Sequence, residues 1–217
     1  MNVGHANAVT LTWALLTKAA DTITPKEFSD YFRLKALLAN PTPKNRQAFR
    51  HGFTTYYRLN IGGLTDDFKQ AYFDLLFACT PVGDPDPYTK LLLDLYKLPR
   101  RKGDQTIQAS FVTKLVAIHD ESRPIFDRHV SAFFGVGVPS VGSKEFRVAG
   151  FVRNLRAIQT EYESWAADAR FADVRAAISE KQPLMKNCHP TRVCDFLVWT
   201  VGARLTPKSK LGTDVPQ

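Results

Sequence analysis

Lys114 and Asp127 are the two residues of this sequence whose types and surroundings best suit chemistry. Lys114 lies in an expected helix over residues 106–119. The apolar residues of that helix recur at helical spacing: Ile107, Phe111, Leu115 and Ile118. At about 100° per residue, Lys114 falls about 20° outside Ile107, at the edge of this stripe, with Ser110 as its i−4 neighbour. Partial desolvation there lowers the pKa of a lysine, which an amine nucleophile requires. The alternative is a lysine that lays its stem on the core and keeps its ammonium in water.

Asp127 follows the turn marked by Pro124 and begins the next expected helix. Aspartate is a preferred N-cap residue, so a purely structural role is the alternative here. The two roles are compatible, because a capped carboxylate is held rigid and ionised. Such a group could stabilise positive charge on a sugar or deprotonate an attacking amine or water.

The remaining histidines and cysteines offer weaker candidates. His119 lies in the apolar stripe and is expected to be a buried, hydrogen-bonded histidine, whereas His129 is close enough in sequence to Asp127 to reach the same cleft. Cys188, His189 and Cys194 lack a fourth ligand at zinc spacing. We therefore expect no metal site and no cofactor.

The charge of the chain points to a polyanionic partner. The formal net charge is +8, from 29 Lys and Arg against 21 Asp and Glu. Residues 33–58 contain no acidic residue, and a second basic cluster precedes the lysine helix. Such patches attract nucleic acid through its phosphates, although a solvated basic face that maintains solubility is the alternative. The expected nucleic-acid-binding residues are Arg46, Arg50, Arg100, Arg101, Lys102, Arg128 and His129.

The periodicity predicts an all-α protein, because no segment alternates with a period of two. We expect one helical domain over residues 1–217, with a candidate boundary between two lobes in the proline-rich loop near residues 81–88. The expected helices span residues 8–20, 25–38, 44–57, 66–79, 88–96, 106–119, 127–134, 144–167, 172–181 and 191–205.

The composition also bounds the setting of the protein. A hydrophobic content of 44% is enough for a substantial core. The first ten residues are too polar for a signal peptide, and no apolar run is long enough to span a bilayer. Three cysteines, an odd number, favour a reducing compartment over a disulfide framework. We therefore expect a cytoplasmic protein with no membrane contact.

A family resemblance rests on three segments of the sequence. Residues 107–115, Pro124-Ile125-Phe126-Asp127 with Val130, and residues 193–202 resemble bacterial proteins with an 8-oxoguanine DNA glycosylase-like fold. Those proteins are distant relatives of the helix-hairpin-helix DNA glycosylase superfamily. The resemblance covers roughly residues 98–130 and 191–202 and implies a two-lobed helical fold that binds DNA.

In that superfamily a lysine forms a Schiff base with the deoxyribose C1′ and a following aspartate assists. By motif position, the resemblance assigns these catalytic roles to Lys114 and Asp127. Two departures bear on the assignment. Residues 104–113 contain no glycine, whereas the superfamily has a glycine-containing hairpin before its lysine, and the interval from Lys114 to Asp127 is shorter than in well-studied members. The sequence therefore leaves three hypotheses open: a DNA glycosylase, a non-catalytic nucleic-acid-binding module of a defence or regulatory kind, and a helical protein-interaction domain.

Overall fold

A computed structural model of the chain describes residues 3–61, 64–79, 82–98, 103 and 105–206. The regular elements within these ranges are all helical, so the all-α prediction is confirmed for the described residues. The helices are α1 (Val3–Thr22), α2 (Pro25–Ala39), α3 (Pro43–Tyr56), α4 (Asp66–Ala78), α5 (Thr89–Tyr96), α6 (Ala109–His119), α7 (Arg128–Phe134), α8 (Lys144–Ala167), α9 (Ala169–Lys181) and α10 (Pro190–Leu205), with short 3₁₀ turns at Leu59–Ile61 and Pro183–Asn187.

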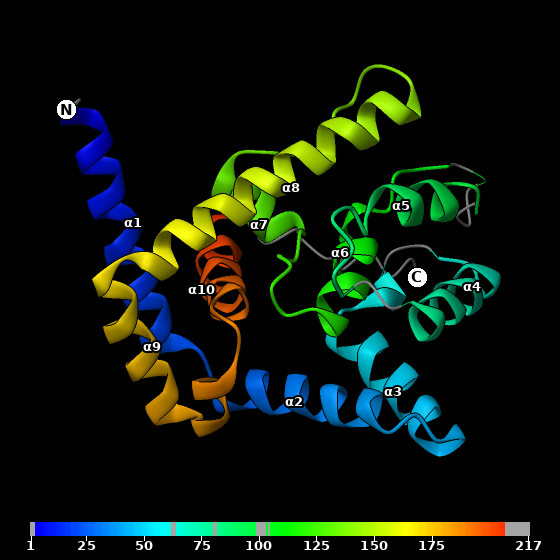
Figure 1. The fold of residues 1–217 in the computed structure, drawn as a ribbon, viewed down its shortest axis with the longest axis horizontal. Coiled ribbons are helices and arrows are strands. Elements are labelled where there is room, and N and C mark those ends of the chain that lie inside the picture. Colours follow the sequence, from blue (N-terminus) through cyan, green and yellow to red (C-terminus); the bar gives the residue numbers. More distant parts are fainter. Residues whose placement is uncertain (1–2, 62–63, 80–81, 99–102, 104, 207–217) are drawn as a thin grey trace, which may run out of the picture.

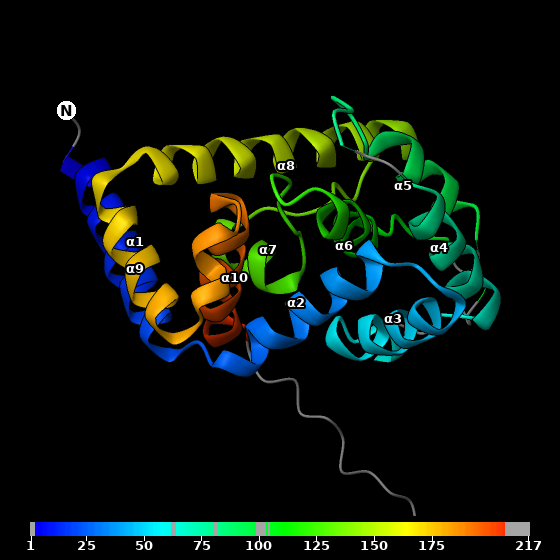
Figure 2. The same ribbon diagram turned by 60° about the horizontal axis from the view of Figure 1, so that its bottom comes forward.

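The helices form two groups joined by α2 and α8 (Figures 1 and 2). Helices α1, α9 and α10 lie at one end, and α3, α4 and α5 lie at the other. The long helix α8 packs on α9 and α10 at one end of the molecule and on α5 at the other. Helices α6 and α7 occupy the middle, so the turn between them lies where the two groups meet. The candidate boundary near residues 81–88 falls in the connection between α4 and α5.

The helix starts follow the capping chemistry of the sequence. Before α2, the Glu27 carboxylate accepts a hydrogen bond from the Thr24 backbone N–H at 2.9 Å, as a capping box requires. Before α8, the Ser143 hydroxyl accepts from the Phe146 N–H at 3.2 Å. These two predicted helix starts are confirmed.

Two helix starts differ from the prediction for local reasons. Helix α6 begins at Ala109 rather than near residue 106, because Gln108 is not helical (φ −86°, ψ 51°) and its side-chain amide binds the Thr106 hydroxyl at 2.8 Å. Helix α9 begins at Ala169 rather than near residue 172, because the Asp168 carboxylate accepts from the Arg170 N–H at 2.9 Å.

The core runs continuously through both groups of helices. Phe49 and Phe53 of α3 are fully buried. Helix α10 packs closely on α7 at Gly202, where a Cβ atom would lie only 2.1 Å from the His129 carbonyl oxygen. Glycine is therefore required for this approach, which sets the position of α7 and of the Asp127 cap that precedes it.

A buried ion pair ties α10 to the middle of the molecule. The Arg192 and Asp195 side chains are 1% and 6% exposed and form a short ion pair one helical turn apart. Arg192 also donates to the carbonyls of Ala117 and Arg123, and Asp195 accepts from the Ile125 N–H at 3.1 Å. Asp195 therefore ties the last helix to the core.

The described residues contain no group of three His, Cys, Asp or Glu side chains that could hold a metal ion. Cys188 and Cys194 are buried free thiols. Among the described helices, none combines the length and the apolar character that a membrane span needs.

Candidate functional site

Lys114 lies in an almost closed environment on α6. Its side chain is directed into the protein, and the residue is 8% exposed. The ammonium nitrogen lies 2.9 Å from the Ser110 hydroxyl, one turn earlier on the same helix. Aromatic rings cover it from two sides, with Nζ 5.4 Å from the Tyr57 ring centroid and 6.0 Å from that of Phe111.

The environment of Lys114 shifts its pKa. Burial lowers the pKa of Lys114, while the negative charge of Asp127 opposes this shift. A lowered pKa enlarges the fraction of free amine near neutral pH, and only the free amine can act as a nucleophile or base. The helical period placed Lys114 at the rim of the core. In the structure the residue is buried more deeply than that position indicated.

Two clamps hold the turn between Lys114 and Asp127. On one side, the hydroxyl of Thr113, the residue before Lys114, accepts from the Phe126 N–H at 3.0 Å. On the other side, Asp195 of α10 accepts from the Ile125 N–H. Because both clamps bind residues immediately before Asp127, α6 and α10 jointly fix where its carboxylate lies.

Asp127 is the N-cap of α7, as the sequence predicted. Its Oδ1 accepts from the backbone N–H groups of His129 at 2.8 Å and Val130 at 3.1 Å. Both bonds fall on Oδ1, and no described residue donates a hydrogen bond to Oδ2. The second oxygen therefore remains available to a ligand or to a nearby positive charge.

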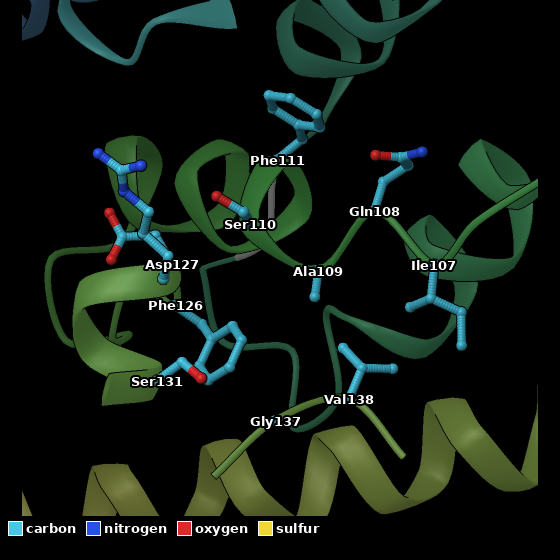
Figure 3. Close-up of a pocket in the computed structure, with 11 residues that line it drawn as sticks. Ile107, Gln108, Ala109, Ser110, Phe111, Phe126, Asp127, Ser131, Gly137 and Val138 are labelled. Atoms are coloured by element: carbon cyan, nitrogen blue, oxygen red, sulfur yellow. The ribbon is translucent and has the colours of Figure 1, made fainter. Parts of the chain in front are cut away.

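A cavity of about 280 Å³ opens beside these residues (Figure 3). Ser110 lies on the side of α6 nearest Asp127, while Phe126, Gly137 and Val138 form the wall toward α8. Lys114 is not among the described residues that line the cavity, but its amine contacts the hydroxyl of Ser110, which is among them. The lining residues are Ile107, Gln108, Ala109, Ser110, Phe111, Phe126, Asp127, Arg128, Ser131, Gly137 and Val138.

Arg128 and His129 occupy different environments although both follow Asp127. Arg128 lines the cavity, and its Nε donates to His129 Nε2 at 3.3 Å. His129 is buried against the Trp199 ring, with a centroid separation of 5.1 Å, and its Nδ1 lies 3.0 Å from the Thr206 hydroxyl. Burial lowers the pKa of His129, so its packing favours the neutral ring. His129 does not line the cavity.

Arg46 and Arg50, the predicted nucleic-acid-binding residues of α3, do not line this cavity and instead pack against α4. The guanidinium groups of Arg46 and Arg50 each lie 5.0 Å from a phenylalanine ring centroid, that of Phe77 and Phe73 respectively. Arg50 also lines a second groove, of about 360 Å³, between α3 and α4. The other predicted contacts, Arg100, Arg101 and Lys102, lie outside the described residues.

His119 is hydrogen-bonded as predicted, because its Nε2 lies 2.8 Å from the Leu76 carbonyl oxygen, but it is half-buried rather than buried. Sequence reasoning did not identify Tyr57 and Phe111 as the rings that lie over the Lys114 amine. Tyr57 comes from α3, far away in the sequence, so no local pattern could have identified it. The i−4 spacing did identify Ser110 as a neighbour of Lys114, but not its place at the cavity wall.

Comparison of the chain with protein-family models, with curated proteins and with solved structures found no match. The assignment of chemistry to this site therefore depends on its own geometry.

Proposed function

We propose that this protein binds DNA and removes a modified base, with Lys114 as the nucleophile and Asp127 as its assisting carboxylate. The observation that carries the proposal is the pairing of a desolvated amine with a rigidly capped carboxylate across one turn, next to a cavity. The resemblance of residues 107–130 to glycosylase-like proteins supports the same roles.

In this reaction the free amine of Lys114 attacks C1′ of the nucleotide, and the base departs with the bonding electrons and takes up a proton released by the amine. The C1′–O4′ bond of the resulting aminosugar then breaks, with its electron pair and a proton passing to O4′, and the C1′–N imine forms. The Lys114 amine reaches the cavity by leaving the Ser110 hydroxyl. Asp127 stabilises the positive charge that develops on the sugar and on the resulting imine. The cavity beside Ser110 and Phe126 receives the base after it leaves the duplex stack.

The basic residues supply the sequence-independent part of the affinity. Arg128 at the cavity contacts a phosphate near the reacting nucleotide, and the sequence cluster Arg100, Arg101 and Lys102 adds further phosphate contacts. Replacing the last three together with alanine weakens binding to every sequence and reduces its salt dependence by up to about three phosphate contacts. Unchanged affinity and salt dependence in that variant would remove this segment from the DNA surface.

A specific observation favours a second candidate, a nucleic-acid-binding module without chemistry. Lys114 does not line the cavity, its amine contacts the Ser110 hydroxyl, and one Asp127 oxygen is already used by the helix cap. In this alternative Lys114 and Asp127 stabilise the α6–α7 turn, and only the basic surface contacts the nucleic acid.

The two candidates are separated by incubating the protein with a panel of duplexes that carry damaged or modified bases. A glycosylase nicks one of them after alkali treatment, and borohydride traps the imine as a protein–DNA crosslink. Lys114→Ala abolishes trapping but leaves binding intact, and Asp127→Asn slows base release by about two orders of magnitude. Binding without base release from any duplex would favour the module, and absence of binding would exclude both.

A further inference from the structure

We propose that Ser110 and Lys114 form a serine–lysine dyad, in which Ser110 is the nucleophile and Lys114 its general base, and that the cavity takes a small carboxylic ester. This activity goes beyond the proposed function and needs no nucleic acid. It uses the same amine as a base rather than as a nucleophile, so the two assignments are alternatives for Lys114.

The order of the side chains favours this arrangement. Ser110 lines the cavity, while Lys114 does not line it and has its Nζ 2.9 Å from the serine oxygen. A nucleophile must face the substrate, and its base must be within hydrogen-bond reach of the proton it accepts. The structure satisfies both conditions without moving either side chain.

The surroundings of the amine suit a base. Burial lowers the pKa of Lys114, and the rings of Tyr57 and Phe111 lie over its amine. The titratable and charged groups that face it are Asp127 at the start of α7 and Tyr57 at the end of α3. Asp127 stabilises the ammonium that forms when the serine proton is taken, so it favours the step that generates the nucleophile.

The start of α6 offers donors for the oxyanion of an acyl-transfer reaction. Ala109 and Ser110 are the first two residues of the helix, so their backbone N–H groups have no partner within it. Gln108 does not cap them, because its side chain binds Thr106 instead. Both residues line the cavity, and the helix dipole favours negative charge at this end.

The reaction proceeds in two balanced stages. As the Ser110 oxygen bonds to the ester carbonyl carbon, its proton moves to the Lys114 amine and the carbonyl electron pair moves onto oxygen. Collapse of this intermediate breaks the bond to the alcohol, which leaves with the proton from Lys114. Water then attacks the acyl-serine, again giving a proton to Lys114, and the collapse returns that proton to the Ser110 oxygen as the carboxylic acid departs.

The size and lining of the cavity indicate the class of ester. A volume of about 280 Å³ lies at the lower end of the range for small-molecule sites, so the substrate is small. Phe111, Phe126 and Val138 provide apolar contacts for the acyl group. Arg128 and Asp127 are the charged residues of the described lining, and Arg128 can contact a polar substituent of the ester.

The test is labelling of the full chain with a fluorophosphonate, which phosphonylates activated serines. We expect one adduct on Ser110, found by mass spectrometry of the intact protein and of its peptides, and no adduct in Ser110→Ala. Lys114→Met should slow labelling at least about 100-fold, in line with loss of a general base. Lys114→Arg should do the same, because arginine keeps the charge but does not release its proton.

The matched control is Ser131→Ala. Ser131 lines the same cavity, but its hydroxyl is donated to the Val136 carbonyl at 2.7 Å and has no lysine beside it. Labelling should continue at the original rate in this variant, with folding of all variants checked by circular dichroism. An unlabelled wild-type protein, an adduct elsewhere, or equal labelling of folded Lys114→Met would overturn the dyad. None of these outcomes depends on DNA, so the glycosylase test succeeds or fails separately.

Discussion

Arg192 and Lys114 are both buried basic residues, but the groups around Arg192 compensate its charge and those around Lys114 do so only weakly. Arg192 has a carboxyl partner in Asp195 and two backbone carbonyls, those of Ala117 and Arg123. Lys114 has one neutral hydroxyl partner, Ser110, and two aromatic rings. Arg192 is thus nearly neutralised by its surroundings, whereas the charge of Lys114 is poorly compensated.

The difference follows from what each side chain can do. Arginine stays protonated in proteins, so its burial must be balanced by fixed acceptors. Lysine can lose its proton, so a poorly compensated site is relieved by a lowered pKa. The Arg192 region holds the α6–α7 turn in place, and the Lys114 region keeps a lysine with a lowered pKa within the field of Asp127.

The largest expected effect on stability comes from breaking the Arg192–Asp195 ion pair. Asp195→Ala leaves the Arg192 charge buried and unpaired and removes the acceptor of the Ile125 N–H, so we expect a loss of about 3–5 kcal/mol in the free energy of unfolding. Urea denaturation followed by circular dichroism measures this loss. The control is Asp94→Ala, which removes ion pairs with Lys90 and Lys97 at the surface and should cost less than about 1 kcal/mol. Equal losses in the two variants would contradict the special role of the buried pair.

A smaller effect is expected at the helix cap that both regions share. Asp127→Ala removes the acceptor for the His129 and Val130 N–H groups, and the loss of such a cap costs about 1 kcal/mol. Asp127→Asn keeps a cap oxygen and should lose only a few tenths of that. Urea denaturation of the two variants side by side checks the order. If Asp127→Asn is as unstable as Asp127→Ala, the carboxylate charge and not the cap stabilises this turn.

Lys114→Met should change stability least, and in the opposite direction from Asp195→Ala. The substitution removes a poorly compensated charge and places an apolar chain of similar length between Tyr57 and Phe111. We therefore expect the free energy of unfolding to stay within about 1 kcal/mol of the original value or to rise. A loss above about 3 kcal/mol in denaturation experiments would mean that Lys114 is as well compensated as Arg192.

The sequence predicted the helices and several of their ends because the relevant chemistry is local. Thr24 with Glu27, Ser143 and Asp127 are capping residues that act on the backbone next to them. The starts of α6 and α9 were predicted wrongly. The interaction of Gln108 with Thr106 delays the start of α6, and the cap formed by Asp168 lets α9 begin earlier than the apolar pattern indicated.

The site was only partly predictable for the same reason. The helical period placed Lys114 at the rim of the core, and the capping signal marked Asp127. The closure of Tyr57 over the amine and the clamp from Asp195 depend on α3 and α10, which are distant in sequence. The Arg192–Asp195 ion pair carried no local signal beyond its i, i+3 spacing, so its connection to the α6–α7 turn required the structure.

The last prediction uses pH to distinguish the two cations. Because burial lowers the pKa of Lys114 in the folded protein, the unfolded chain binds more protons between the folded pKa and the ordinary value for lysine. The contribution of Lys114 to stability therefore rises with pH across this window, by at most about 1.4 kcal/mol per pH unit. Arg192 contributes no such slope, because it does not titrate there.

Comparing wild type with Lys114→Met isolates this slope, since all other titrating groups are common to both proteins. Urea denaturation from neutral pH to about pH 9 should show the wild type gaining on the variant as pH rises. Asp127→Asn should lower the pKa of Lys114 further, because the Asp127 charge opposes the effect of burial. The wild type is compared with Lys114→Met, and Asp127→Asn is compared with the double variant Asp127→Asn, Lys114→Met. The gain in stability should begin at lower pH in the second comparison than in the first. Parallel stability curves for wild type and Lys114→Met would show that the amine stays protonated throughout, and with that the free base required by both proposed reactions would be missing.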